Sequence, residues 1–176
     1  MIMKKLPTEW RPLPIGALKA ELAGFSDWVL CGGHSVALIT GQDTRSHGDI
    51  DIGVFRSQVV DCLRLVGKDR VFLCRSGNHE PWSGEAVPGD VHDIWITDQK
   101  GKYWALQVMV FDDEGEFVVY RRDRRIRWLK KHHSTPISGI KILNPFITVL
   151  FKTNKATLEE KEIQDVVKLI ENSLPQ

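Results

Sequence analysis

The stretch from Trp28 to Phe55 constrains the fold of this chain more than any other part of the sequence. It opens with a short apolar run of the length of a buried strand, and a pair of glycines follows directly. It closes with Asp49–Phe55, where acidic and aliphatic residues alternate as they do along a β-strand. The stretch therefore predicts a strand, a glycine turn, a short helix that Gly41 ends, and a second strand: residues 28–31, 32–33, 34–40 and 49–55.

The alternation in the second strand is the chemical clue. Because residues i and i+2 of a strand point to the same face, Asp49 and Asp51 should lie side by side. Ile50 and Ile52 should then point to the opposite face. Two adjacent carboxylates raise each other's cost of ionisation, and a divalent cation such as Mg²⁺, which prefers oxygen ligands, removes that cost. Acids also alternate on many solvent-facing strands, so this pair alone does not identify a metal site.

The glycine pair Gly32-Gly33 adds a second feature. Glycines let the backbone approach a ligand closely, and a helix N-terminus offers unpaired N–H groups to phosphate. Taken alone, two glycines are more often only a tight turn. A carboxylate pair that binds a metal beside a phosphate-binding turn is, however, the combination that nucleotidyl transfer requires.

The two features together carry a resemblance to a known family. Gly32-Gly33 followed by residues 44–52 (TRSHGDIDI) resembles the signature of small nucleotidyltransferases of the polymerase-beta superfamily, in particular the aminoglycoside and lincosamide nucleotidyltransferases. His34 stands where these enzymes usually have an aromatic residue. The resemblance extends weakly through Leu106–Met109 and the region of Phe151 and Lys152.

The resemblance implies an α+β, α/β-like fold with a mixed, mostly antiparallel sheet flanked by helices. It implies that Asp49 and Asp51 are catalytic and bind Mg²⁺. It also implies a nucleotide site for ATP or another NTP, formed by residues from the glycine pair, the signature and the C-terminal region: Gly32, Gly33, His34, Arg45 and Lys152.

A third carboxylate is expected in this family on a neighbouring antiparallel strand. The matching position in this sequence is Gln107, whose amide oxygen binds a cation weakly and carries no charge. Asp93 could substitute from the preceding strand, and we consider it the candidate general base. Asp112 or Asp113 could serve only if the register shifted by several residues.

Two further signature residues leave alternatives open. Arg45 could brace a triphosphate through two hydrogen bonds, or could simply pair with Asp49 or Asp51. His47 is expected to form structural hydrogen bonds and not to bind a metal.

The rest of the chain predicts further helices and strands joined by turns. We expect helices over residues 15–25, 59–66 (with Ser57 as N-cap), 145–152 and 158–174, and strands over 70–74, 91–97, 102–111, 117–120 and 137–142. Residues 75–90 are expected to be a loop, and 98–101 and 112–115 turns. Ile163, Val166, Val167 and Ile170 are expected on one face of the last helix. These patterns suggest a core over residues 1–143 and a packed helix pair over 144–176.

The segment Arg121–His133 is a dense basic run: it contains seven Lys and Arg residues and a single acid, Asp123. Such a run is most often a solvated strand and loop. Its Arg121–Lys131 part could instead bind an RNA backbone or substrate phosphates, with Trp128 stacking on a base.

Composition sets the remaining bounds. The chain has 176 residues and a net charge of +1, which points to no particular partner. Its three cysteines have no metal-binding spacing and fit a reducing, cytoplasmic compartment. No membrane span or signal peptide is expected.

The sequence therefore predicts a Mg²⁺-dependent nucleotidyltransferase that moves NMP from an NTP to a hydroxyl of a small molecule, possibly antibiotic-like. The alternatives are a nucleic-acid-acting enzyme of the tRNA-modifying or toxin/antitoxin type and a nucleotide-binding pseudoenzyme.

Overall fold

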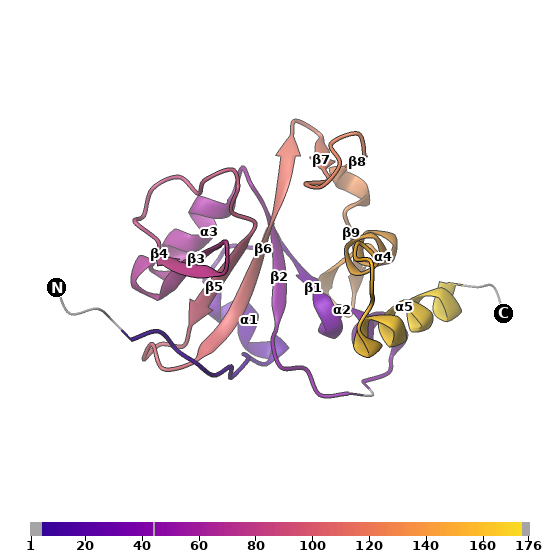
Figure 1. Cartoon of the computed structure of the whole chain (residues 1–176), viewed down its shortest axis with the longest axis horizontal. Coiled ribbons are helices and arrows are strands. Elements are labelled where there is room, and N and C mark those ends of the chain that lie inside the picture. Colours follow the sequence, from indigo (N-terminus) through magenta and orange to yellow (C-terminus); the bar gives the residue numbers. More distant parts are fainter. Residues whose placement is uncertain (1–4, 44, 174–176) are drawn as a thin grey trace.

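A mixed β-sheet forms the centre of the molecule (Figure 1). The computed structural model describes residues 5–43 and 45–173. The main path through the sheet is β4-β3-β5-β6-β2-β1-β10-β9, and β7 and β8 extend from β6. The strands are β1 (Trp28–Cys31), β2 (Asp51–Phe55), β3 (Val71–Arg75), β4 (Asn78–Pro81), β5 (Asp93–Thr97), β6 (Trp104–Glu114), β7 (Phe117–Val119), β8 (Arg127–Leu129), β9 (Ser134–Ile137) and β10 (Ile140–Leu143).

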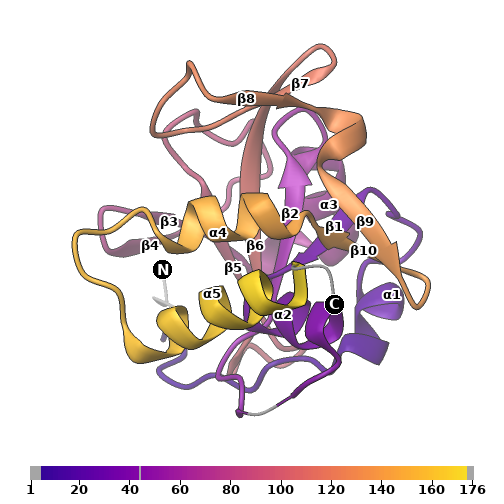
Figure 2. The same ribbon diagram turned by 90° about the vertical axis from the view of Figure 1, so that its right-hand side faces the viewer.

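Helices cover both faces of this sheet. Short 3₁₀ turns at Lys68–Arg70 and Lys130–His132 accompany the α-helices, which are α1 (Ile15–Glu21), α2 (Gly32–Thr40), α3 (Val59–Val66), α4 (Pro145–Lys152) and α5 (Glu160–Ser173). Figure 2 shows α2, α4 and α5 gathered on one side of the molecule, and α2 and α4 both contact α5. Within the described residues, no helix combines the length and apolarity needed to cross a bilayer.

The main core lies between the sheet and helices α1 and α3. Both isoleucines of the alternating strand, Ile50 and Ile52, are fully buried in this core, together with Leu18 of α1 and Leu63 of α3. The alternation therefore separates the side chains as the sequence predicts for Ile50, Ile52 and Asp51: the two isoleucines are in the core, and Asp51 is on the other face. That other face carries a smaller cluster around Phe111 and the start of α4.

Strand β2 lies between β1 and β6 in the sheet. It pairs antiparallel with β1 and parallel with β6, and Asp51 is the register partner of Gln107. The third carboxylate position was expected on a strand antiparallel to β2, and this prediction is wrong because β6 runs parallel to β2. Gln107 does, however, lie next to Asp51. The fold class is confirmed: most strand pairs are antiparallel, and among the strands that the structure describes only β1–β10 and β2–β6 pair in parallel.

Several predicted boundaries are wrong for identifiable local reasons. Asp49 precedes β2 and is not part of it. Ser57 does not cap α3, because its hydroxyl donates to Asp113 while Gln58 occupies the N-cap position. Residues 112–114 continue β6 instead of turning, because they pair with β7. The expected loop at 75–90 contains β4, and the expected strand at 137–142 is split into β9 and β10 by a turn at Ser138-Gly139.

The last helix presents a different face to the molecule than its apolar pattern predicts. Ile163, Val167 and Ile170 are 41%, 44% and 53% exposed, whereas Asp165 and Leu169 are buried. Leu174, the expected end of this helix, lies outside the described residues. The helix turns its acidic side inward because basic side chains of the candidate site face it there. The division at residue 143 stays a prediction.

Candidate active site

The turn from β1 into α2 forms one wall of the candidate site. Cys31, the last residue of β1, is the register partner of Asp51, and α2 begins at the next residue, Gly32. A Cβ at position 32 would collide with Oδ2 of Asp51. The glycine pair is thus the first turn of a helix instead of a separate turn, and Gly32 leaves the space that the Asp51 carboxylate occupies.

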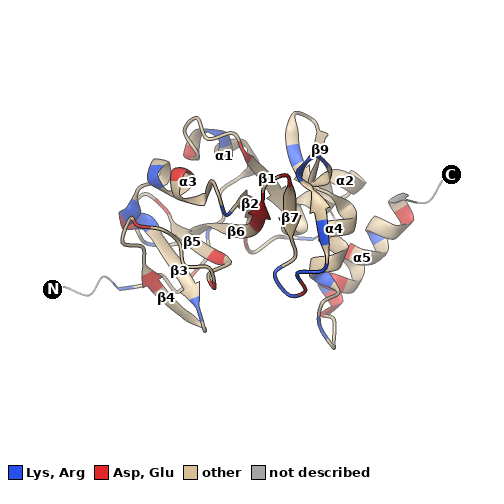
Figure 3. Ribbon diagram, turned by 90° about the horizontal axis from the view of Figure 1, so that it is seen from above, with Lys and Arg blue, Asp and Glu red and all other residues tan. Residues whose placement is uncertain are grey.

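Asp51 is the most strongly perturbed carboxyl group of the site. Burial and the nearby charge of Asp49 raise its pKa to about 7, and Asp93 acts in the same direction. Lys152 and Lys161 oppose this effect. The structure therefore brings Asp49, Asp51 and Asp93 within electrostatic range of one another, with ammonium groups from the C-terminal helices nearby. Figure 3 shows basic positions on α4 and α5, which lie on one side of β2 and β6.

The donor set fits a hard divalent cation. Within residues 5–43 and 45–173, no side chain donates a hydrogen bond to Asp49 or Asp51 or forms an ion pair with either, so both carboxylates keep their oxygen lone pairs available. In the same part of the chain, no three or more His, Cys, Asp and Glu side chains are grouped as metal ligands. The available set is therefore two carboxylates and the Gln107 amide, to which phosphate oxygens would add.

Asp93 lies beside Gln107, as the hairpin between their strands predicts. The Gln107 amide donates to Oδ1 of Asp93 at 3.2 Å, and the guanidinium of Arg121 lies 3.5 Å from Oδ2. The Asp93 side chain is 38% exposed, so solvent and small molecules reach it. Asp112 and Asp113 are engaged elsewhere, because they pair with Arg56 and Lys130.

A buried ion cluster holds the basic side of the site. Oδ2 of Asp165, whose side chain is only 3% exposed, lies 3.0 Å from Arg45 and 2.9 Å from Lys152. The pairing of Arg45 with Asp49 or Asp51 is thus wrong, since its partner comes from the last helix. Nε of Arg45 is buried without a hydrogen-bond partner in the described part of the chain.

The imidazole rings of His34 and His47 lie against each other beside the glycine pair, with an angle of 41° between their planes. The rings of His34 and His47 lie 4.3 Å apart, and His47 forms a hydrogen bond with Asp43 at 3.0 Å. Burial and the neighbouring His47 lower the pKa of His34. A Cβ at Gly33 would lie 2.5 Å from Nη2 of Arg45 and 2.5 Å from Nδ1 of His47. Gly33 therefore allows both signature side chains to cover the start of α2. Thr44 lies outside the described residues.

Replacing Gly32 by Ala is expected to destabilise the protein more than replacing Gly41 by Ala. Both glycines have φ of +66°. A Cβ on Gly32 would meet the Asp51 side chain, whereas a Cβ on Gly41 would meet no atom within 4 Å. Gly41→Ala should cost about 1 kcal/mol for its backbone conformation, and Gly32→Ala about 2 kcal/mol more because Asp51 must move. Urea denaturation of both variants measures the difference. Equal losses would mean that Asp51 moves away freely and is not fixed against the glycine.

Comparison with known proteins bears on the fold. No model of a known protein family matches the sequence, and no curated protein matches it. Among solved structures, the lincosamide antibiotic adenylyltransferase LnuA with lincomycin bound is similar, with a TM-score of 0.54 and 15% sequence identity over 83% of this chain and 87% of that one. The chain has a nucleotidyltransferase fold. At this identity the likeness reaches no further than the fold.

Acids of the same surface pair with part of the basic run. Arg124 pairs with Glu114, Arg125 with Asp123, and Lys130 with Asp113. Trp128, the expected stacking residue, lies parallel to the ring of His133 and donates to its Nδ1 at 3.1 Å. These contacts favour the structural interpretation of the run.

From the sequence, Asp165 lies in the tail that resembles the same nucleotidyltransferase group, but it is interpreted as part of a packed helix pair and not as part of the site. Its position among the apolar residues of an amphipathic helix resembles an ordinary solvent-facing acid. The available signal was the pair of cations, Arg45 and Lys152, that the resemblance had already assigned to one nucleotide site: two cations held together need an anion.

Proposed function

We propose that this protein is a Mg²⁺-dependent nucleotidyltransferase that transfers NMP from ATP or another NTP to a hydroxyl of a small molecule. The observation that supports it most is the pair Asp49 and Asp51. Within the described residues no protein cation is bonded to either carboxylate, and Asp51 lies against the glycine start of α2. Bound Mg²⁺ would neutralise the triphosphate and lower the barrier to its cleavage. Asp49, Asp51 and Gln107 would hold it.

The nucleotide is proposed to lie on the α2 side of Asp51. Residues of the first turn of α2 would offer backbone N–H groups to phosphate, and Arg45 and Lys152 would offer positive charge. His34, whose lowered pKa keeps its ring neutral, lies beside the glycine pair and would pack against the nucleotide. Asp165 fixes Arg45 and Lys152 by its two ion pairs.

The proposed reaction is a displacement at the α-phosphorus. The oxygen of the acceptor hydroxyl forms a bond to this phosphorus, the bond from phosphorus to the bridging oxygen breaks, and pyrophosphate leaves. The acceptor's proton passes to a carboxylate, for which Asp93 is the candidate because it is partly exposed and borders Gln107.

Reducing conditions such as those of the cytoplasm suit the free thiols of Cys31, Cys62 and Cys74.

The direct test is nucleotide binding by isothermal calorimetry with and without Mg²⁺. We expect binding that requires Mg²⁺ and is lost in Asp49→Ala and Asp51→Ala, while Asp61→Ala, on the exposed face of α3, binds as the wild type does. Binding that is independent of Mg²⁺, or absent from the wild type, would refute the proposal. Nucleotide bound without turnover on any acceptor would instead support the pseudoenzyme alternative.

A further inference from the structure

The face of the sheet that carries Asp51 continues into an aromatic surface on the side away from α2. Across the strands, Asp51 is the register partner of Gln107, Gln107 of Trp95, and Trp95 of Phe72. Register partners point to the same face of a sheet. The isoleucines that flank Trp95, Ile94 and Ile96, lie in the main core on the opposite face. Trp95 therefore lies on the face of the catalytic carboxylates, two strands away.

Five aromatic side chains meet on this part of the sheet, and we call them the aromatic shelf: Trp10, Phe72, His79, Trp95 and Trp104. The ring of His79 lies 4.4 Å from that of Trp95 and 5.2 Å from that of Trp104. Trp104 reaches this face because the register shifts between Ile96 and Thr97. Phe72 and Trp104 are buried beneath, whereas His79 and Trp95 remain partly exposed.

The exposed rings of the shelf keep their polar atoms available. Within the described residues, neither the indole N–H of Trp95 nor the imidazole of His79 forms a hydrogen bond. Burial lowers the pKa of His79, so the ring is neutral at pH 7. Charged groups at the borders are paired, Arg75 with Glu80 and Arg121 with Asp93. The shelf therefore offers ring faces and single hydrogen-bonding groups, and no unbalanced charge.

We infer that the aromatic shelf binds the acceptor, and that the acceptor is an uncharged hydroxyl compound with a ring that stacks on Trp95 and His79. This inference rests on the proposed function. In a displacement at phosphorus the attacking oxygen enters opposite the leaving oxygen. The residues proposed to hold the triphosphate lie on the β1 and α2 side of Asp51, so the acceptor enters from the β6 and β5 side, where the shelf begins.

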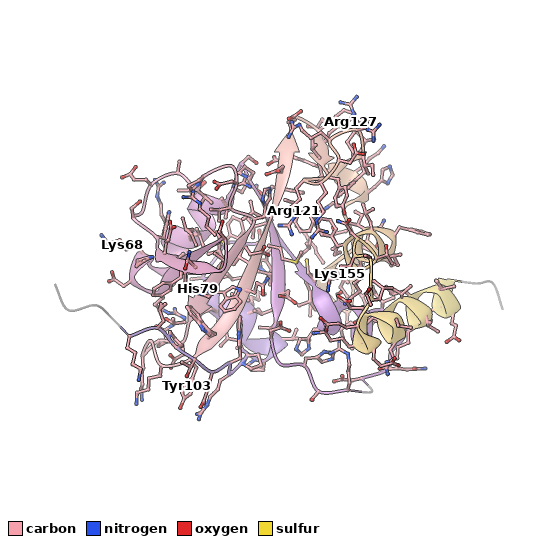
Figure 4. All side chains as sticks on the ribbon, viewed as in Figure 1. Lys68, His79, Tyr103, Arg121, Arg127 and Lys155 are labelled. Carbon is pink, nitrogen blue, oxygen red and sulfur yellow. The ribbon has the colours of Figure 1, made fainter. Side chains whose placement is uncertain are left out.

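The distances along the sheet suit this arrangement. Neighbouring strands are about 4.8 Å apart, which places Trp95 roughly 10 Å from Asp51. A ring on Trp95 can therefore carry a hydroxyl to Asp93 and Asp51, since Asp93 is on the same strand and face as Trp95. Figure 4 shows His79 over the strands on one side of the central sheet and Lys155 near the C-terminal helices on the other, with Arg121 between them.

Fluorine NMR of the full chain labelled with 5-fluorotryptophan tests the inference. Three probes are titrated with the nucleotide site filled by Mg²⁺ and a non-hydrolysable ATP analogue: benzyl alcohol, a methyl glucopyranoside, and glycerol as a hydroxyl compound without a ring. The Trp95 signal, assigned by its loss in Trp95→Phe, is expected to move with a ring-bearing probe and not with glycerol. Movement with benzyl alcohol identifies an aromatic acceptor, and movement with the glycoside a sugar.

Two results would overturn the inference. One is a Trp95 signal that no ring-bearing probe moves, or that glycerol moves equally. The other is movement of Trp28 alone, because Trp28 lines a separate hollow of about 800 Å³ with Phe25 and Ile140.

Variants separate this inference from the proposed function. Trp95→Ala should weaken probe binding by roughly tenfold because ring stacking is lost. In this variant, binding is measured from the Trp104 signal. Trp95→Phe should retain most of the binding. Tyr103→Ala, an aromatic change outside the shelf, should have no effect. All three should bind Mg²⁺-nucleotide as the wild type does. If the wild type binds nucleotide but no probe moves the Trp95 signal, the acceptor site is refuted and the proposed function is not. If the wild type binds no nucleotide, the proposed function itself is refuted.

Discussion

Replacing Asp51 by Asn is expected to abolish nucleotidyl transfer and, at the same time, to stabilise the metal-free protein at pH 8. Activity should fall by roughly 10³-fold or more, because the variant loses a charged cation ligand at the reacting centre. The stability effect follows from the raised pKa of this group, about 7, which burial and Asp49 cause. At pH 8 the wild type must hold a half-buried carboxylate in its ionised form, and asparagine removes this cost.

The pH dependence of this effect has a definite sign. Because the folded pKa of Asp51 lies above its ordinary value of 3.8, its protonated form contributes stability that is complete below pH 3.8 and is lost as the pH rises through about 7. Asp51→Asn should therefore gain about 1–3 kcal/mol over the wild type at pH 8 and little at pH 4. Urea denaturation at both values, without divalent cations, measures this gain.

Two controls accompany the experiment. Asp61→Asn, an exposed aspartate of α3, should show no such gain. Adding Mg²⁺ should stabilise the wild type at pH 8 and leave Asp51→Asn unchanged. A variant that is destabilised at pH 8 would show that the carboxylate is stabilised by its surroundings, contrary to the electrostatics described above.

Replacing Asp165 by Ala is expected to destabilise the packing of the C-terminal helices strongly. It leaves Arg45 and Lys152 facing each other without their shared anion, at a cost of about 3 kcal/mol. Burial opposes the charged form of Asp165, but the hydrogen bonds from Lys152 and Arg45 outweigh it and lower the pKa. The contribution of Asp165 is therefore present at neutral pH and is lost as the pH falls through its lowered pKa.

The same substitution should weaken nucleotide binding, because Arg45 and Lys152 then lose their fixed positions. Thermal melts and calorimetry with Mg²⁺-nucleotide measure the two effects. Glu171→Ala, an exposed acid on the same helix, is the matched control and should change neither. If Asp165→Ala proved as stable as the control, the buried ion cluster would contribute nothing to the fold.

Part of this site could be read from the sequence because its signal is local. The alternation at residues 49–55 separates Ile50 and Ile52, which enter the core, from Asp51, which does not. The start of α4 could also be predicted from the sequence. Asn144 caps the helix by accepting a hydrogen bond from the Phe146 N–H, and Pro145 is its first residue. Each of these features depends on residues within one turn or one strand.

The parts that could not be predicted depend on contacts between distant segments. Asp165 joins the site across 120 residues of chain to Arg45. The aromatic shelf exists only through the register of β3, β4, β5 and β6, and β4 itself lay in an expected loop. The Ser138-Gly139 turn was missed because Ile137 and Ile140 flank it and read as one apolar strand.

The position of Asp165 near the end of the chain has a consequence for biosynthesis. Asp49, Asp51 and the glycine start of α2 emerge from the ribosome early, whereas the anion that fixes Arg45 and Lys152 emerges only with α5. A nascent polypeptide thus carries the acidic half of the site before its cationic half is assembled. Under the proposed function, capture of nucleotide would require that α5 has been translated.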